Sequence, residues 1–106
     1  MNFMGNSIGA INMKEIYNDT LAKINQRQRQ VIVHSVLYYR FDTNIISDAK
    51  WNELAKDLVK LQSDFKELTK QSAFYVTMQD FDASTGYHLA DNEWGIQKAL
   101  YFMRNI

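Results

Sequence analysis

The chain of 106 residues contains no cysteine and no proline, and it has only four glycines. The absence of cysteine excludes disulfides, thiolate zinc sites and cysteine nucleophiles. The two histidines, His34 and His88, lie far apart in the sequence and do not have the spacing of metal ligands. No proline or glycine occurs between Ala10 and Gly86. Nothing in that stretch breaks a helix, so long helices are expected.

The chain also lacks an excess of charge of either sign, because twelve lysines and arginines balance twelve aspartates and glutamates. A neutral chain has no bulk field that attracts nucleic acid, so no direct nucleic-acid binding is expected. Neutrality removes a common guard against self-association, which makes a homodimer an alternative to the monomer. No apolar run approaches the ~20 residues of a membrane span, and no secretion signal is visible. We therefore expect a single-domain cytoplasmic protein without a membrane partner.

The first helix is predicted over residues 13–41. Two glycines in the first nine residues suggest a flexible leader over residues 1–12, and either Met1 or Met13 is the native start. Asn12 and Glu15 stand in the capping-box arrangement, which favours a helix start at this point. The residues expected on one face of this helix are Ile16, Leu21, Ile24, Val31, Ser35, Val36 and Tyr39.

An entirely polar stretch, residues 25–30, lies in the middle of that helix. We interpret it as a solvated face. The alternative is a phosphate-binding patch formed by Arg27 and Arg29. Since these arginines are only two positions apart, they diverge around the helix and cannot readily grip one phosphate together.

The second helix is predicted from Ser47 to about Thr69. The short connector before it, residues 42–45, favours an antiparallel hairpin. Ser47 is expected to cap the helix, and Asp48 places a carboxylate in its first turn. One apolar stripe is expected to face the core. Its members are Trp51, Leu54, Ala55, Leu58, Leu61, Phe65 and Leu68.

The last third of the chain is less regular. Residues 73–78 are aromatic and β-branched, so they predict either a short strand or an extended or one-turn segment packed on the hairpin. Residues 80–86 form a turn cluster, and Asp91 or Asn92 is expected to cap a final helix over residues 93–104. Its core-facing side chains are expected to be Trp94, Ile96, Ala99, Leu100 and Met103. The predicted fold is all-α, with a long antiparallel helical hairpin closed by a C-terminal helix.

The corner of the hairpin, LYYRFDTNIISDAKWNEL at residues 37–54, brings aromatic side chains together with a carboxylate and an amide. Residues 31–61 around it resemble the small N-terminal domain Ia of NAD-dependent DNA ligases. In that family the motif clamps the nicotinamide mononucleotide (NMN) half of NAD. The resemblance assigns ligand-binding roles to Tyr38, Tyr39, Asp48, Trp51 and Asn52. Packing is the alternative role for Tyr38, Tyr39 and Trp51, since aromatic residues at helical spacing are usually core.

Two residues depart from the ligase pattern. Trp51 stands where the ligases have a tyrosine, and Asn52 stands where they have a second aspartate. Trp51 can still stack on a ring but has no phenol hydroxyl, and Asn52 brings no charge to balance a cationic nicotinamide. The lysine nucleophile of ligases, in a Lys-x-Asp-Gly setting, has no counterpart in this sequence. We therefore expect no enzyme activity, no catalytic residue and no cofactor beyond weak NMN or NAD binding.

The C-terminal part, residues 80–100, is similar to the tail of short phage-encoded proteins related to ligases. In those proteins an Asp-Phe-Asp-Gly-Ser-Thr-Gly turn precedes a helix that contains tryptophan. In the present turn Asp80, Asp82 and Ser84 alternate like calcium ligands, but position twelve is Asp91 and not glutamate. A turn that caps itself through its Asp and Ser side chains is the preferred interpretation, and no metal site is expected.

These resemblances lead to two hypotheses. The first is a non-catalytic phage or prophage accessory protein in the host cytoplasm that binds a protein partner, for instance to inhibit a bacterial defence enzyme. The second is a module that binds NMN or NAD and assists a separate DNA ligase or nucleotidyltransferase. His34, one turn before Tyr38, is expected to be a packed histidine, and a catalytic base is the alternative.

Overall fold

The computed structural model describes the backbone of residues 4–105 and the side chains of residues 14–105. The elements are α1 (Met4–Phe41), α2 (Asp48–Asp64), α3 (Lys66–Thr69), α4 (Tyr75–Met78), the 3₁₀ turn η1 (Tyr87–Leu89) and α5 (Glu93–Arg104). No strand occurs among the described residues, so the all-α prediction is confirmed.

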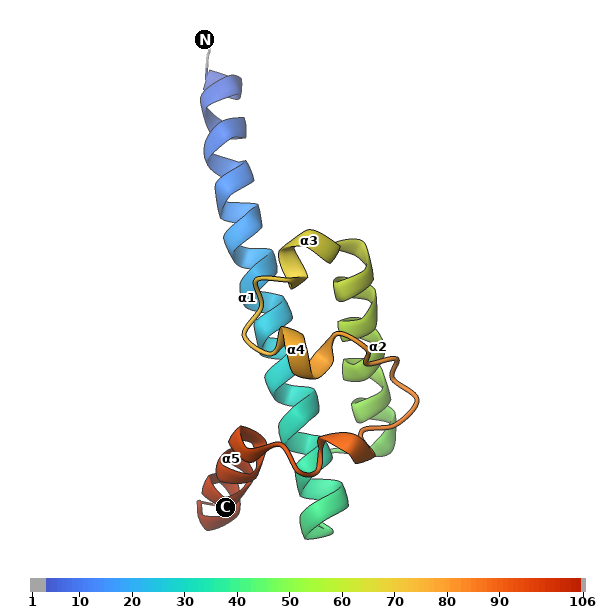
Figure 1. The fold of residues 1–106 in the computed structure, drawn as a ribbon. Helices are drawn as coiled ribbons and strands as arrows, with labels where there is room; N and C mark the ends of the chain where they lie inside the picture. The colour runs from blue at the N-terminus through green and yellow to red at the C-terminus, as the bar shows by residue number, and fades with distance from the viewer. Residues whose placement is uncertain (1–3, 106) are drawn as a thin grey trace.

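The helix α1 is the long axis on which the other elements pack. It contacts α2, α3, η1 and α5, and α2 and α5 lie on opposite sides of it in Figure 1. The connector of residues 42–47 reverses the chain, so α1 and α2 form the predicted antiparallel hairpin. The C-terminal helix α5 closes the fold, as the sequence predicts.

The start of α1 differs from the prediction. Residues 4–12 continue the helix at its N-terminal end, so Asn12 lies inside α1 and not at its cap. The predicted leader falls largely outside the described residues, because residues 1–3 are not described and residues 4–13 are described only in their backbone. Ile16, which was expected on the core side, is 60% exposed, because it borders an open surface hollow beside α3 and does not enter the core.

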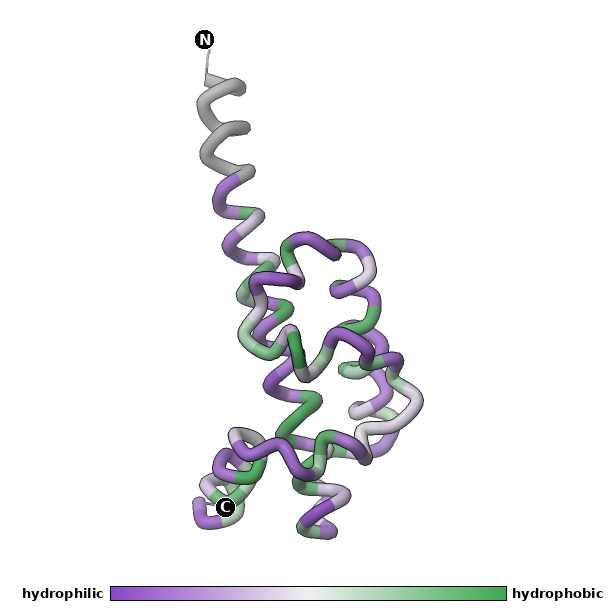
Figure 2. Tube along the Cα trace, viewed as in Figure 1, coloured by the Kyte–Doolittle hydropathy of each residue, from purple (hydrophilic) through white to green (hydrophobic). Residues whose placement is uncertain are grey.

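The core lies where α1 faces α2 and is completed by side chains from the segments that follow. Leu58 is fully buried in the middle of the α2 stripe, and hydrophobic and hydrophilic residues alternate around that helix in Figure 2. The buried apolar residues are Ile24, Val31, Ile32, Val33, Val36, Leu37, Leu54, Ala55, Leu58, Leu68, Met78, Phe81, Leu89 and Ala99. Burying apolar surface is worth about 25 cal/mol per Å², so this cluster is the main source of stability.

The helix α5 approaches α1 closely through Gly95. A Cβ atom at this position would lie 2.7 Å from Ile32 Cγ2 and 2.9 Å from Val36 Cγ2, closer than real contacts allow. The Asn92 side chain caps the helix by accepting a hydrogen bond from the Gly95 N–H at 2.8 Å, as predicted. Met103 was expected to cover the core but is 37% exposed, because it lies in the last turn of α5, away from this contact.

The predicted second helix is broken at Phe65. This residue leaves helical geometry with φ −126° and ψ 59°, so α2 ends at Asp64 and α3 begins at Lys66. The Phe65 side chain is 41% exposed, whereas Leu68 and Thr69 of α3 are buried. The bend directs α3 back toward α1, and burial of Leu68 and Thr69 replaces the burial expected for Phe65.

The polar stretch of α1 was expected to be solvated, but Gln28 is fully buried. Its side-chain Nε2 donates to Ser72 Oγ at 2.8 Å and to Gln62 Oε1 at 3.0 Å. Its Oε1 accepts from the Phe74 N–H at 3.0 Å. The neighbouring Asn25 accepts from the Ala73 N–H at 2.8 Å. These side chains hold the chain after α3 against α1, and the following residues 75–78 form the one-turn alternative, α4, and not a strand.

Among residues 4–105, two residues that are not glycine adopt left-handed backbone conformations. Asp42 has φ 50° directly after α1, and Ala83 has φ 69° in the turn before η1. Each is followed by a residue that lines the hollow at the hairpin corner, Thr43 and Ser84. Side chains with a Cβ atom disfavour this region by about 1–2 kcal/mol, a cost that applies fully to Ala83 and less to Asp42, because aspartate tolerates this conformation better.

A search of the described part of the chain for membrane spans identifies no helix whose length and apolar character would let it cross a bilayer.

Candidate functional site

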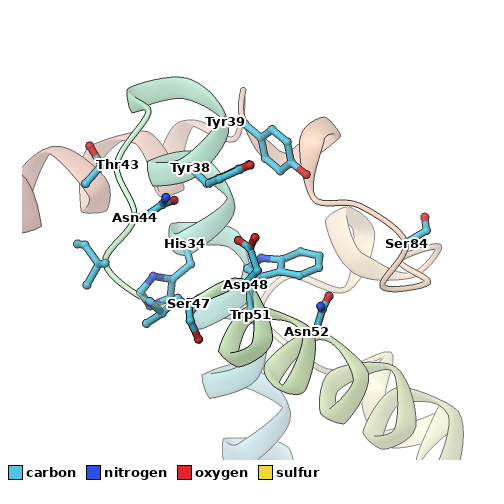
Figure 3. Close-up of a pocket in the computed structure, with 12 residues that line it drawn as sticks. His34, Tyr38, Tyr39, Thr43, Asn44, Ser47, Asp48, Trp51, Asn52 and Ser84 are labelled. Atoms are coloured by element: carbon cyan, nitrogen blue, oxygen red, sulfur yellow. The ribbon is translucent and has the colours of Figure 1, made fainter.

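A pocket of about 260 Å³ lies at the corner where α1 ends and α2 begins (Figure 3). Its wall combines the last turns of α1, the connector, the first turn of α2 and one residue of the later turn. The lining residues are His34, Tyr38, Tyr39, Thr43, Asn44, Ile45, Ile46, Ser47, Asp48, Trp51, Asn52 and Ser84. All five residues that the ligase resemblance singles out therefore line one cavity.

The two tyrosines form an aromatic rim at the end of α1. Their rings meet edge to face with centroids 4.7 Å apart, and Tyr38 and Tyr39 remain 42% and 39% exposed. The Tyr39 hydroxyl lies 3.1 Å from Thr85 Oγ1, and its ring meets Tyr87 edge to face at 5.6 Å. The end of α1 is thereby joined to the turn that carries Ser84. The exposure shows that these tyrosines are not core residues, although Tyr39 also has a packing role.

Trp51 belongs both to the pocket and to the packing of the domain. Its indole is half-buried, and Nε1 donates to the buried Ser35 Oγ at 3.1 Å. A Cβ atom at Gly86 would collide with the Ser35 side chain and would lie 3.0 Å from Trp51 Cζ2, so the chain needs glycine at this close approach. The ring also meets Phe81 edge to face at 6.3 Å. The indole is therefore held rigidly in the wall of the pocket.

Two polar side chains at the start of α2 remain available to a ligand. Ser47 caps the helix by accepting from the Lys50 N–H at 3.0 Å, so Asp48 is not needed as the cap. Asp48 and Asn52 are exposed, and neither side chain hydrogen-bonds to another residue in the described part of the chain. In Figure 3 the Asp48 carboxylate points into the pocket below Tyr38. A ligand in the pocket would meet these groups without breaking an existing bond.

His34 lines the pocket one turn before Tyr38. Burial lowers the pKa of the His34 imidazole below its ordinary value, because desolvation penalises the charged form. The shift favours the uncharged form of the ring. The half-burial agrees with the expected packed histidine, and a molecule in the pocket would meet His34 in its wall.

No protein-family model, no curated protein and no solved structure matches this chain. The geometry of the pocket and the chemistry of its residues are therefore the basis for a functional proposal.

Side chains of the two alternative sites, the phosphate patch and the calcium loop, are engaged in hydrogen bonds within the protein. Arg27 does not form a phosphate patch with Arg29, because its Nε donates to Asp57 Oδ2 at 2.6 Å and its Nη1 donates to Gln30 Oε1 at 2.8 Å. Asp82 Oδ1 accepts from the Ser84 N–H at 2.9 Å and from Ser84 Oγ at 2.6 Å. This is the self-capping turn that the sequence favours over a calcium loop. No group of three potential metal ligands gathers within the described residues.

Several lining residues were not foreseen as part of a site. Thr43 and Asn44 of the connector approach the pocket because Asp42 reverses the chain. Ser84 arrives from more than thirty residues further along the chain through the turn at Ala83. The connector residues could have been suspected from their position beside the aromatic motif. The sequence contains no local signal that would place Ser84 at the hairpin corner.

Proposed function

We propose that this protein is a non-catalytic binding module whose corner pocket takes the nicotinamide end of NMN or NAD. The observation that supports the proposal most is that Tyr38, Tyr39, Asp48, Trp51 and Asn52 line a single cavity. The resemblance to ligase domain Ia assigns a ligand-binding role to these five positions, of which Trp51 and Asn52 depart from the ligase pattern. The pocket moves this hypothesis ahead of the protein-binding one.

The size and chemistry of the pocket suit the ring and its sugar. Pockets for drug-sized ligands enclose about 300–1,000 Å³, so a cavity of about 260 Å³ holds part of a dinucleotide and leaves the rest outside. Tyr38 and Trp51 offer faces for stacking on a flat ring. Asp48 and Asn52 can accept hydrogen bonds from ribose hydroxyls or a carboxamide.

Titration with NMN tests the proposal. Stacking and a few hydrogen bonds at an open site are expected to give a micromolar to millimolar Kd, about 4–8 kcal/mol of binding free energy. NMN is expected to quench the fluorescence of Trp51, measured in a Trp94→Phe background so that one tryptophan reports. Asp48→Ala is expected to abolish the response.

The control is Asp80→Ala, which removes an exposed carboxylate that does not line the pocket. This variant should bind NMN like the parent protein, and both variants should keep the helical circular dichroism spectrum. No saturable response of the parent protein up to about 10 mM NMN, beyond the millimolar range expected for such a site, would contradict the proposal.

Protein binding is the second candidate, favoured by exposed apolar side chains on the last helix. Tyr101, Phe102 and Met103 of α5 are 54%, 45% and 37% exposed. A phage or prophage accessory protein could use this face against a host partner such as a bacterial defence enzyme. In a pull-down from bacterial lysate, Phe102→Ser is expected to reduce the amount of captured partner about ten-fold. The control Val76→Ser changes an apolar residue of α4 that is 80% exposed, and it should leave the captured amount unchanged. Capture that is equal for both variants would exclude this face as the binding surface.

A further inference from the structure

A second hollow lies beside the corner pocket, and Ser84 lines both cavities. This second hollow measures about 390 Å³, and Val59 and Ala83 contribute apolar side chains to its lining. In Figure 3 Asn52 and Ser84 border the corner pocket on the side away from Asn44. A ligand of the corner pocket that extends past Asn52 and Ser84 would therefore enter the second hollow.

One face of α2 borders both cavities. Asp48 and Asn52 line the corner pocket, whereas Lys56 and Lys60 line the second hollow. Residues four positions apart lie on the same face of a helix, and Lys56 follows Asn52 by about 6 Å along the helix axis. The proposed site assigns hydrogen bonds with the ribose to Asp48 and Asn52. The group that follows the ribose in NMN is a phosphate, and it would meet the next residue of this face, Lys56.

The charged side chains of the second hollow are only partly paired with one another. Lys60 Nζ pairs with Asp64 Oδ2 at 2.9 Å. Asp82 Oδ1 accepts hydrogen bonds from the Ser84 hydroxyl and N–H, and these bonds lower the pKa of the Asp82 carboxyl, so its charged form is favoured. Lys56 forms no ion pair among residues 14–105. The hollow therefore offers one unpaired cation, Lys56, and one carboxylate, Asp82, that opposes the binding of an anion.

This balance of charges favours a phosphate that is attached to a bound ligand over a free phosphate ion. Asp82 offsets the attraction of Lys56 for any anion in the hollow, so free phosphate is held weakly. A phosphate attached to a ribose in the corner pocket is kept close to Lys56, which raises its effective concentration there. Two other cations near the corner, Lys50 and Arg40, form ion pairs and line neither cavity. Lys56 is therefore the cation placed to meet the phosphate.

We infer that the second hollow receives the phosphate of NMN, that Lys56 pairs with this phosphate, and that Asp82 limits the strength of the contact. The inference rests on the proposed function, because the nicotinamide and the ribose must occupy the corner pocket to bring the phosphate there. Neither Lys56 nor Asp82 lines the corner pocket. Nicotinamide riboside has the ring, the carboxamide and the sugar of NMN but no phosphate, so a difference between their affinities reports on the phosphate alone.

Titrations with NMN and with nicotinamide riboside, followed by Trp51 fluorescence in the Trp94→Phe background, test the inference. NMN is expected to bind about five-fold more tightly, since one ion pair at about 4 Å in a solvated site has that order of effect. Lys56→Gln is expected to bring the ratio of the two affinities to about one. Asp82→Asn can still accept the bonds from Ser84 but loses the opposing charge, so it is expected to raise the ratio to about ten-fold. The control Lys98→Gln removes an exposed cation of α5 that lines neither cavity, and it should leave the ratio unchanged.

Salt tests the same contact without a change at Lys56 or Asp82. Raising the salt concentration from about 20 mM to about 500 mM screens charge interactions, so it is expected to bring the affinity of NMN close to that of nicotinamide riboside. Equal affinities at low salt, a ratio unchanged in Lys56→Gln, or a ratio that falls in Asp82→Asn would each overturn the inference while leaving the proposed function in place. Binding of neither compound would overturn both.

Discussion

Leu58→Ala is expected to lower the free energy of unfolding by about 2–5 kcal/mol, the range for truncating a buried leucine. Leu58 is fully buried in the middle of α2, where that helix faces α1. Removing its side chain leaves a cavity between α1 and α2, because the two packed helices cannot move together far enough to fill the space. Urea denaturation followed by circular dichroism measures the change.

The matched control is Lys56→Ala, on the same helix but on its exposed face. Surface substitutions of this kind usually change stability by less than about 0.5 kcal/mol. A loss below about 1 kcal/mol for Leu58→Ala would contradict the placement of Leu58 at the centre of a close-packed core.

Gln28→Leu is expected to destabilise the protein by about 2–3 kcal/mol, although it places an apolar side chain of similar size in a buried position. The carboxamide of Gln28 satisfies the Phe74 N–H and contacts the side chains of Gln62 and Ser72. Leucine can replace none of these bonds, so buried polar groups lose their partners. Leaving a buried donor or acceptor unsatisfied costs about 1–3 kcal/mol.

Gln26→Leu provides the control, because Gln26 is exposed on the same helix. It should change the denaturation midpoint little. Hydrogen exchange adds a local test, since Gln28→Leu should speed exchange of the amide protons of residues 72–78 more than those of α2. If Gln28→Leu were neutral or stabilising, the carboxamide would not be what holds this segment to α1.

Much of the fold follows from local patterns in the sequence. Ser47 and Asn92 cap α2 and α5 as their chemistry predicts, and α1 ends at Phe41 as expected. The apolar stripe from Leu54 to Leu58 identifies the face of α2 that is buried. The grouping of the five candidate residues could also be predicted from the sequence, because they lie within fifteen positions of one another at a hairpin corner. Short-range geometry is sufficient to bring such residues together.

The features that were missed depend on contacts distant in sequence. Gln28 was assigned to a solvated face because its neighbours are polar, but it continues the stripe of Ile24, Val31 and Ser35 at helical spacing. That spacing is the signal that could have identified it as buried. Its partners, however, lie 34 to 46 residues further along the chain. The break at Phe65 has no proline or glycine to announce it and results from the packing of α3 on α1.

The left-handed residues Asp42 and Ala83 affect both the stability of the domain and the shape of its pocket. A sequence optimised only for resistance to unfolding would place glycine or asparagine at such positions. Strained backbone persists only when its surroundings hold it in place, and it tends to gather at functional sites. Here it lies immediately before Thr43 and Ser84, on two borders of the cavity. A substitution that relaxes either turn would therefore alter two borders of the candidate pocket, so a gain in heat resistance at these positions should be accompanied by a change in the shape of the cavity.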